Sequence, residues 1–216
     1  MKELYMDLHD DRREYLKGEL RRVDLEEDPI KQFEDWLAQA FQSDVVDPPA
    51  MTVATVAPDG KPSQRIVLLK HVDALGFVFY TDYESKKGSD LDLNPNICLH
   101  FPWHAIERQV RVVGVVEKLA LEESKKYFHS RPRGSQLAAA VSPQSQVISS
   151  RDELEKRYRD YETACGSGEV PFPERWGGYR VIPSEIEFWQ GGANRLHNRF
   201  RYSLQKDVWF IERLAP

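Results

Sequence analysis

The stretch MTVATVAPDGKPSQRIVLLK, residues 51–70, decides the fold class of this chain. Its side chains alternate with a period of two on both sides of Asp59-Gly60, a dipeptide that is typical of tight hairpin turns. This pattern predicts two consecutive antiparallel strands, over residues 51–56 and 63–70.

The same β pattern continues along the chain. Further strands are predicted at residues 77–81, 97–103, 109–119, 179–182, 185–190, 199–204 and 208–213. Helices are predicted at 84–93, 121–129 and 151–164, and an amphipathic helix is predicted from Asp28-Pro29 to about Ser43. About eight short strands without regular βαβ alternation indicate a mainly β protein, an antiparallel barrel with flanking α-helices.

The length of 216 residues fits one domain over 1–216, and we expect residues 1–20 to be a mobile segment, because 8–20 is charged and only weakly amphipathic. Residues 166–173 read as a loop, since two prolines there cannot join an interior ladder.

The net charge of −5 argues against nucleic acid as a partner, so anion binding must come from local clusters of Arg and Lys. No apolar run approaches the roughly 20 residues of a membrane helix, and the first residues lack the apolar centre of a signal peptide. Cys98 and Cys165 form no CxxC or disulfide framework. We therefore expect no membrane association, a cytoplasmic location and reduced, structural thiols.

Several familiar motifs are absent from the sequence: GxGxxG after a strand, the P-loop, HExxH and GxSxG. His100 and His104 have the i, i+4 spacing of a helical metal site, but the surrounding LHFPWH reads as a strand interrupted by proline. No metal site is expected.

Two basic clusters accompany the first strands. In RIVLLK, strand alternation places Arg65 and Lys70 on opposite faces, where they could serve different ligands or different parts of one site; the alternative is solvation of the strand ends. Lys86 and Lys87 follow Tyr80-Thr81 and open a helix, where free N–H groups and the helix dipole favour an anion, although a solvated charge run is the alternative.

Two more clusters lie further along the chain. In YFHSRPRGSQ, residues 127–136, two guanidinium groups and several hydroxyl donors surround a proline turn, which favours phosphate binding. In residues 188–199, an extended backbone would place Arg195, His197 and Arg199 on one face. Trp189 beside a glycine pair makes this a possible planar-ligand site, and a charged surface strand is the alternative.

These clusters belong to longer motifs, which occur in the order RIVLLK, FYTDYESKKG, ERQVRVVG, YFHSRPRGSQ, EFWQGG, RLHNRF and ERLAP. Over nearly the whole chain the sequence resembles the pyridoxine/pyridoxamine 5′-phosphate oxidase family. The resemblance implies an FMN-binding split β-barrel and a homodimer whose two FMN sites are each built from both subunits. It implies an oxidase that converts pyridoxine 5′-phosphate and pyridoxamine 5′-phosphate to pyridoxal 5′-phosphate, the final step of making this vitamin B6 cofactor, with O₂ as the acceptor and hydrogen peroxide as a product.

The resemblance also assigns residues by motif. The implied FMN contacts are Arg65, Ile66, Val67, Leu68, Lys70, Tyr80, Thr81, Lys86, Lys87, Gln109, Gln144, Ser145, Trp189 and Arg199. The implied substrate contacts are Arg12, Tyr15, Lys70, Tyr127, Arg131, Ser135, Arg195 and His197. Arg12 and Tyr15 belong to an N-terminal segment that can fold over the substrate.

Three residues carry the implied catalytic roles. Arg195 would place positive charge over the substrate ring, and His197 would orient it or handle a proton. Asp47 matches a carboxylate near the substrate, and its alternative is a turn residue between a helix and a strand.

The chain departs from the family pattern at two positions. Lys86 stands where relatives often have Arg, which keeps the charge but loses the bidentate fork. Asn198 replaces an Asp that is common in this motif, so His197 should be less readily protonated here.

Three other readings stay open. The chain could be a flavin oxidase or reductase of the same fold with another substrate, a ligand carrier without turnover, or a barrel that binds no ligand. Arg21, Arg22 and Arg213 could form a second anion site, for which solvated surface charge is the alternative.

Overall fold

The structure is a computed structural model that describes residues 8–9 and 13–216. The chain forms two compact units. Unit 1 comprises the described residues up to 48 together with Pro102–Val110 and Glu187–Pro216, and unit 2 comprises Pro49–Phe101 and Arg111–Ile186. The prediction of one domain over 1–216 stays a prediction.

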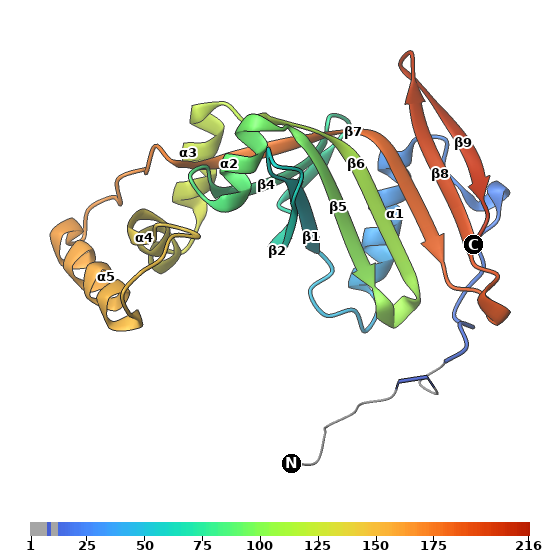
Figure 1. The fold of residues 1–216 in the computed structure, drawn as a ribbon, viewed down its shortest axis with the longest axis horizontal. Coiled ribbons are helices and arrows are strands. Elements are labelled where there is room, and N and C mark those ends of the chain that lie inside the picture. Colours follow the sequence, from blue (N-terminus) through green and yellow to red (C-terminus); the bar gives the residue numbers. More distant parts are fainter. Residues whose placement is uncertain (1–7, 10–12) are drawn as a thin grey trace. The chain divides into compact units, whose positions relative to one another are not determined.

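A nine-stranded sheet dominates the described residues, and its strands follow the order β2-β1-β5-β6-β7-β4-β3, with β8 paired to β7 and β9 (Figure 1). The strands are β1 (Ala50–Val56), β2 (Pro62–Leu68), β3 (His71–Asp73), β4 (Gly76–Asp82), β5 (Asn96–Trp103), β6 (Arg108–Lys118), β7 (Trp176–Gln190), β8 (Asn198–Gln205) and β9 (Val208–Leu214). The pairings of β1 with β2 and β5, of β4 with β3 and β7, and of β8 with β9 are antiparallel. The predicted mainly β, antiparallel fold with flanking helices is confirmed.

The helices are α1 (Pro29–Phe41), α2 (Lys86–Leu93), α3 (Leu121–Ser130), α4 (Arg133–Val141) and α5 (Arg151–Cys165), with short 3₁₀ turns at η1 (Arg22–Asp24), η2 (His104–Ile106) and η3 (Ala193–Arg195). In α1 the Asp28 side chain accepts a hydrogen bond from the backbone N–H of Ile30, as the predicted N-cap requires. Among the helices of the described residues, none combines the length and the apolar character needed to cross a membrane.

Each unit has its own aromatic core. In unit 1 Trp36 and Phe188 pack edge to face, with ring centroids 5.1 Å apart, and Phe188 packs likewise against Tyr202. In unit 2 Phe79 and Tyr179 form part of the sheet core, and a second cluster around Phe128 carries α3 and α4. Because these cores are closely packed, they fix the strand ends and helix starts that carry the site residues.

The structure differs from the predicted secondary structure at three places. The strands predicted at 179–182 and 185–190 are one continuous strand, β7. Pro183 does not interrupt its ladder with β4, because that ladder ends at Val181. Residues 133–141 form helix α4, since Pro132 presets the backbone for a helix start before an alanine-rich run. The short strand β3, paired with the start of β4, was not predicted.

The N-terminal segment predicted to be mobile is only partly described. Residues 13–20 contain neither helix nor strand, and Leu20 at their end is buried. Arg12, a predicted substrate contact, lies outside the described residues. The role of residues 1–20 as a lid stays a prediction.

Candidate functional site

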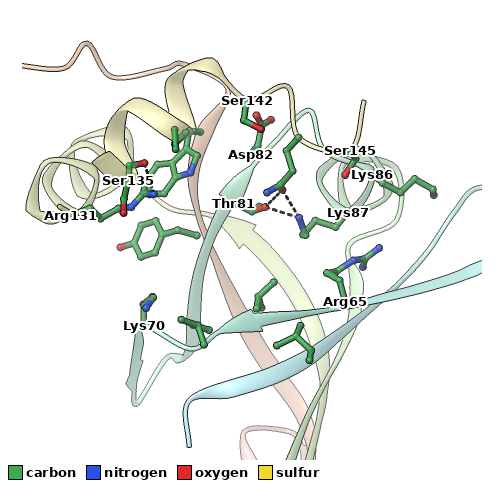
Figure 2. A pocket seen from close by; sticks show the side chains of 18 of the residues that line it. Arg65, Lys70, Thr81, Asp82, Lys86, Lys87, Arg131, Ser135, Ser142 and Ser145 are labelled. Carbon is green, nitrogen blue, oxygen red and sulfur yellow. Dashed lines mark hydrogen bonds between the residues drawn. The ribbon is translucent and has the colours of Figure 1, made fainter. Parts of the chain in front are cut away.

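Unit 2 contains a cavity of about 1040 Å³ that is lined by β2, β4, the start of α2, the region of α3 and α4, and the segment after α4 (Figure 2). Ligand pockets typically measure about 300–1,000 Å³, so this cavity can hold a large ligand together with a smaller one. The predicted site residues that line it are Arg65, Ile66, Val67, Leu68, Lys70, Tyr80, Thr81, Lys86, Lys87, Tyr127, Arg131, Ser135, Gln144 and Ser145.

The cavity has two separate cationic ends. Figure 2 shows Arg65 and Lys87 on one side, and Lys70 and Arg131 on the other. Strand alternation predicted Arg65 and Lys70 on opposite faces. In the structure both residues reach the cavity, but at different parts of it. Lys70 lies two residues beyond the last residue of β2, so its direction is not fixed by the strand.

Lys87 is the central residue of the first end. It is only 6% exposed, and its Nζ donates to Thr81 Oγ1 at 2.9 Å, Gln144 Oε1 at 2.6 Å and Ser85 Oγ at 3.3 Å. All three acceptors are neutral. Burial, and secondarily the charge of Arg65, lower the pKa of Lys87 to about 8. The site thus carries a positive charge whose hydrogen-bond partners do not compensate it.

A chain of hydrogen bonds links the other cations at this end. Arg65 Nη1 donates to Thr55 Oγ1 at 2.9 Å, and the Thr55 hydroxyl donates to Asp90 Oδ2 at 2.8 Å. Asp90 also accepts from Lys86 Nζ at 2.5 Å, an i, i+4 pair along α2. The buried Asp90 carboxylate therefore orients both Arg65 and Lys86. With Lys87, three cations face one carboxylate, so this end of the cavity carries a net positive charge.

The start of α2 adds to this charge. Ser85 caps the helix by accepting a hydrogen bond from the backbone N–H of Gly88, and Lys86 and Lys87 occupy the first turn. Helix N-termini attract anions through their free N–H groups and the helix dipole. The donor set of this end, three cations and a helix start, fits the phosphate of FMN.

The second end is built around Arg131. Its Nη2 donates to the backbone oxygen of Ser135 at 2.8 Å, whereas its Nη1 is buried without a hydrogen-bond partner among the described residues. The guanidinium carbon lies 4.7 Å from the ring centroid of Trp176, a cation–π contact. A buried, unpaired guanidinium N–H in a cavity that Tyr127 and Ser135 also line suits a second phosphate.

Aromatic rings form the wall next to Arg131. Tyr80 stacks on Tyr127 with centroids 3.8 Å apart and on Trp176 at 5.4 Å. Burial raises the pKa of Tyr80 to about 12, so its hydroxyl stays protonated at neutral pH. Sequence reasoning missed Trp176, although an aromatic residue directly before Gly177-Gly178 resembles the Trp189 and glycine pair that it did single out.

The structure corrects the prediction of two phosphate-binding guanidinium groups in the third cluster. Arg133 does not line the cavity; its guanidinium group donates to the backbone oxygens of Gly166 and Gly168. The helical turn at the start of α4 points it away from Arg131, which precedes the helix.

The remaining predicted residues belong to unit 1, where some of them form a second group. Tyr15 packs edge to face against Trp189 and His197, with centroids 5.7 and 5.3 Å away, and the Arg195 guanidinium lies 5.4 Å from the Tyr15 ring. His197 Nδ1 accepts a hydrogen bond from the backbone N–H of Gly192. Burial and the charges of Arg195 and Arg199 lower the pKa of His197, which keeps its ring neutral at pH 7.

The extended backbone predicted across Arg195 is wrong. Ala193–Arg195 form the 3₁₀ turn η3, with Asn194 and Arg195 at φ values of 55° and 63°, and the strand begins only at Asn198. A Cβ at Gly192 would lie 2.5 Å from the backbone oxygen of Leu196, so this turn needs glycine there. Arg195 and His197 therefore do not share a strand face.

Three other predicted residues of unit 1 have different surroundings. Arg199 Nε pairs with Glu187 at 2.7 Å. Gln109 lies in β6, and Asp47 is exposed in a left-handed turn with φ 50°. Asn198, one of the two departures from the family pattern, accepts a hydrogen bond from Arg213. The roles of all these residues stay predictions.

The lowered pKa of Lys87 gives a testable pH dependence. FMN affinity is expected to fall as the pH rises through about 8, by up to about tenfold per pH unit, because the neutral amine no longer attracts the phosphate. The phosphate itself is fully ionised above pH 7 and contributes no slope there. Titrations that follow quenching of flavin fluorescence between pH 7 and 9.5 measure this, and a flat profile would contradict it.

In the ligand-free protein, deprotonation of Lys87 should have the opposite sign of effect: it should raise the free energy of unfolding. Since the pKa of Lys87 is about 8 when folded and 10.5 as the ordinary value, the unfolded chain binds more protons between these limits. The contribution of Lys87 to the free energy of unfolding should therefore rise with pH over this window. The difference in melting temperature between wild type and Lys87→Met isolates this contribution from other groups.

Comparisons with known proteins agree with this geometry. The family described as pyridoxamine 5′-phosphate oxidase matches residues 37–165, and the pyridoxine 5′-phosphate oxidase C-terminal dimerisation region matches residues 176–216. Pyridoxine/pyridoxamine 5′-phosphate oxidases of Vibrio vulnificus (strain YJ016) and Vibrio cholerae (strain ATCC 39541) are 57% and 56% identical, over 98% of this chain and 100% of each relative.

Solved structures show the same likeness. PhzG from Burkholderia lata 383, in complex with tetrahydrophenazine-1-carboxylic acid, has a TM-score of 0.85 at 30% identity, over 90% of this chain and 95% of that one. A pyridoxamine 5′-phosphate oxidase-related, FMN binding protein from Nostoc punctiforme has a TM-score of 0.67 at 16% identity, over 85% and 97% of the two chains. The second likeness is one of fold alone.

Proposed function

Because the chain belongs to the pyridoxamine 5′-phosphate oxidase family, we propose that it is an FMN-dependent oxidase that converts pyridoxine 5′-phosphate and pyridoxamine 5′-phosphate to pyridoxal 5′-phosphate. The fold is the split β-barrel of this family, and FMN is the cofactor. The family's dimerisation region spans 176–216, and the protein is a homodimer.

One observation carries the proposal: a single cavity has two separate cationic ends (Figure 2). Lys87, with Arg65 and Lys86, would hold the FMN phosphate, and Arg131, with Tyr127, would hold the substrate phosphate. An oxidase of this fold for a substrate without phosphate would leave the buried Nη1 of Arg131 unpaired, which costs free energy.

Bound FMN would supply a two-electron oxidation at C4′: a hydride and a proton would leave the substrate and end on O₂ as hydrogen peroxide, and with the amine substrate water would then hydrolyse the imine and release ammonia. The protein's part is to hold the substrate by its phosphate, far from the reacting carbon, so that binding energy fixes that carbon against the cofactor. Arg131 is suited to this task because its position is fixed by Ser135 and Trp176.

The residues of unit 1 complete the proposal. Arg195 would place positive charge over the substrate ring, and neutral His197 would orient the ring or accept a proton there. Trp189, with Gln109 and Arg199, would contact FMN, each site being built from both subunits of the dimer. Asp47, Arg12 and Tyr15 are assigned to the substrate side on the family motifs alone.

A cytoplasmic location belongs to the same proposal. Cys98 and Cys165 are both free thiols in the structure, which is the usual state of cysteines in a reducing compartment.

The test is anaerobic mixing of FMN-loaded protein with pyridoxine 5′-phosphate, followed by admission of air. The flavin absorbance should bleach, then recover in air as pyridoxal 5′-phosphate and peroxide form, while pyridoxine without phosphate should bleach it far more slowly. An unchanged flavin spectrum would leave a binding protein or an oxidase for another substrate. An Arg195→Ala variant that bleaches at the wild-type rate would remove Arg195 from its assigned role.

A further inference from the structure

The Arg175 side chain joins two walls of the cavity without lining it. Arg175 precedes β7, and its side chain is only 20% exposed. Nη1 donates to Asp82 Oδ2 at 3.0 Å, at the end of β4. Nη2 donates to the backbone oxygens of Ala139, Ala140 and Ser142 at 3.0, 2.8 and 3.2 Å, at the C-terminal end of α4. One side chain thus ties β4 to α4.

The α4 side of this link supplies the acceptor for Lys87. The last carbonyls of a helix have no partners within the helix, and a cation there also complements the helix dipole. Arg175 satisfies these carbonyls up to Ser142, two residues before Gln144. Gln144 Oε1 in turn accepts from Lys87 Nζ at 2.6 Å and from Thr81 Oγ1 at 3.0 Å.

The β4 side of the link sets the start of α2. The Asp82 side chain is 5% exposed, and its Oδ1 accepts from the backbone N–H of Glu84 at 2.8 Å. The backbone oxygen of Asp82 accepts from Ser85 Oγ at 2.6 Å, and Ser85 is the N-cap of the helix that carries Lys87. In Figure 2 Asp82 and Ser142 lie next to each other above the hydrogen bonds of Thr81 and Lys87.

We propose that Arg175 is a positioning residue for the site of the cofactor phosphate. Arg175 acts through Gln144 and Asp82 to hold Lys87 in place. The inference rests on the proposed function, in which the FMN phosphate binds at Lys87. A buried ion pair that also satisfies three backbone oxygens is costly to break from one side, so the guanidinium fixes the segment 142–144 against β4. Lys could not replace it, because a single nitrogen cannot reach the carboxylate and all three oxygens.

The first measurement is the FMN dissociation constant of the Arg175→Met protein. It should rise at least about tenfold over wild type, because the segment that carries Gln144 loses its anchor. Arg133→Met is the matched control: Arg133, at the start of α4, also donates two hydrogen bonds to backbone oxygens, but these lie at the C-terminal end of α5 and Arg133 does not line the cavity. An equal loss of affinity in both variants would mean general loosening of α4 and would overturn the proposal.

A double-mutant cycle tests the route through Gln144. Because Arg175 acts in part by placing Gln144, Arg175→Met should raise the FMN dissociation constant by a smaller factor in the Gln144→Ala background than in wild type. Fully additive losses would overturn the proposal. In FMN-saturated Arg175→Met, the KM for pyridoxine 5′-phosphate should stay within about threefold of wild type, since Arg131 precedes the other end of α4. A raised KM with unchanged FMN affinity would also overturn it.

Two results keep this inference separate from the proposed function. If wild type itself does not bind FMN, the proposed function fails and the inference falls with it. If wild type binds FMN and Arg175→Met binds it equally well, the inference alone fails. If Arg175→Met does not fold, Arg175→Lys replaces it as the test variant, because lysine keeps the charge opposite Asp82. Arg175→Lys is expected to lose FMN affinity as well, but by a smaller factor than Arg175→Met. Wild-type FMN affinity in Arg175→Lys would overturn the inference.

Discussion

Replacing Lys87 with methionine should weaken FMN binding by at least about a hundredfold. Lys87 is buried among three neutral acceptors, so a bound phosphate supplies the negative charge that its ammonium group lacks. A hydrogen bond to a charged group contributes about 1.5–3 kcal/mol, and each factor of ten in affinity is about 1.4 kcal/mol. Losing the charge in a site shielded from water therefore removes about two factors of ten or more. Titration of apoprotein with FMN, followed by flavin fluorescence, measures the change.

Lys86→Met is the matched control. Lys86 neighbours Lys87 in the same helix turn, but its side chain is 52% exposed and already paired with Asp90. Water and Asp90 both weaken the attraction between this charge and a phosphate. The loss of FMN affinity in Lys86→Met should therefore stay below about tenfold. Equal losses in the two variants would contradict the distinction that burial makes between them.

The second large effect is expected from Arg131→Met, on the substrate rather than on the cofactor. The KM for pyridoxine 5′-phosphate should rise about a hundredfold, because Arg131 presents a buried N–H with no partner among the described residues, and a phosphate oxygen would satisfy it. FMN affinity should stay within about threefold, since Lys87 and Arg131 lie at opposite ends of the cavity (Figure 2). Steady-state kinetics at saturating FMN and a separate FMN titration measure the two quantities.

Arg133→Met serves as the control for this variant as well. Arg133 lies two positions along the chain and donates only to backbone oxygens of Gly166 and Gly168 in the described part of the molecule, so its loss should leave the KM nearly unchanged. Arg131→Lys should fall between wild type and Arg131→Met, because it keeps the charge but loses the planar fork. Parallel losses of FMN and substrate affinity in Arg131→Met would mean that the cavity does not have two independent ends.

Much of this molecule could be predicted from short stretches of sequence. The two-residue period around Asp59-Gly60 predicts β1 and β2, which pair in antiparallel register from Ala50 with Leu68 to Val56 with Pro62. The Asp28 cap and the apolar spacing after it predict α1. These features are local: a turn residue, a cap or a periodicity acts within a few residues, so the sequence displays it directly.

The basic clusters were also visible in the sequence, but their partners were not. Lys87 stands out as part of a charge run, yet Gln144, which accepts its shortest hydrogen bond, lies 57 residues further along. Arg175 and Asp82 are 93 residues apart, and neither was considered for the site. Gln144 was predicted only from the family resemblance. The spacing of residues along the chain does not show that the segments around Lys87 and Gln144, or around Asp82 and Arg175, meet in the fold.

The sequence by itself determined the mainly β class, the positions of most strands and helices, and the cationic groups available for two phosphates. Only the tertiary structure decided which of these groups are buried and which line the cavity: burial separates Lys87 from Lys86, and a place in the cavity wall separates Arg131 from Arg133. It also decided that Arg195 sits in a left-handed turn and not on a strand. The physical reason is that secondary structure follows from neighbouring residues, while burial, charge compensation and pKa depend on what distant segments bring to the same place.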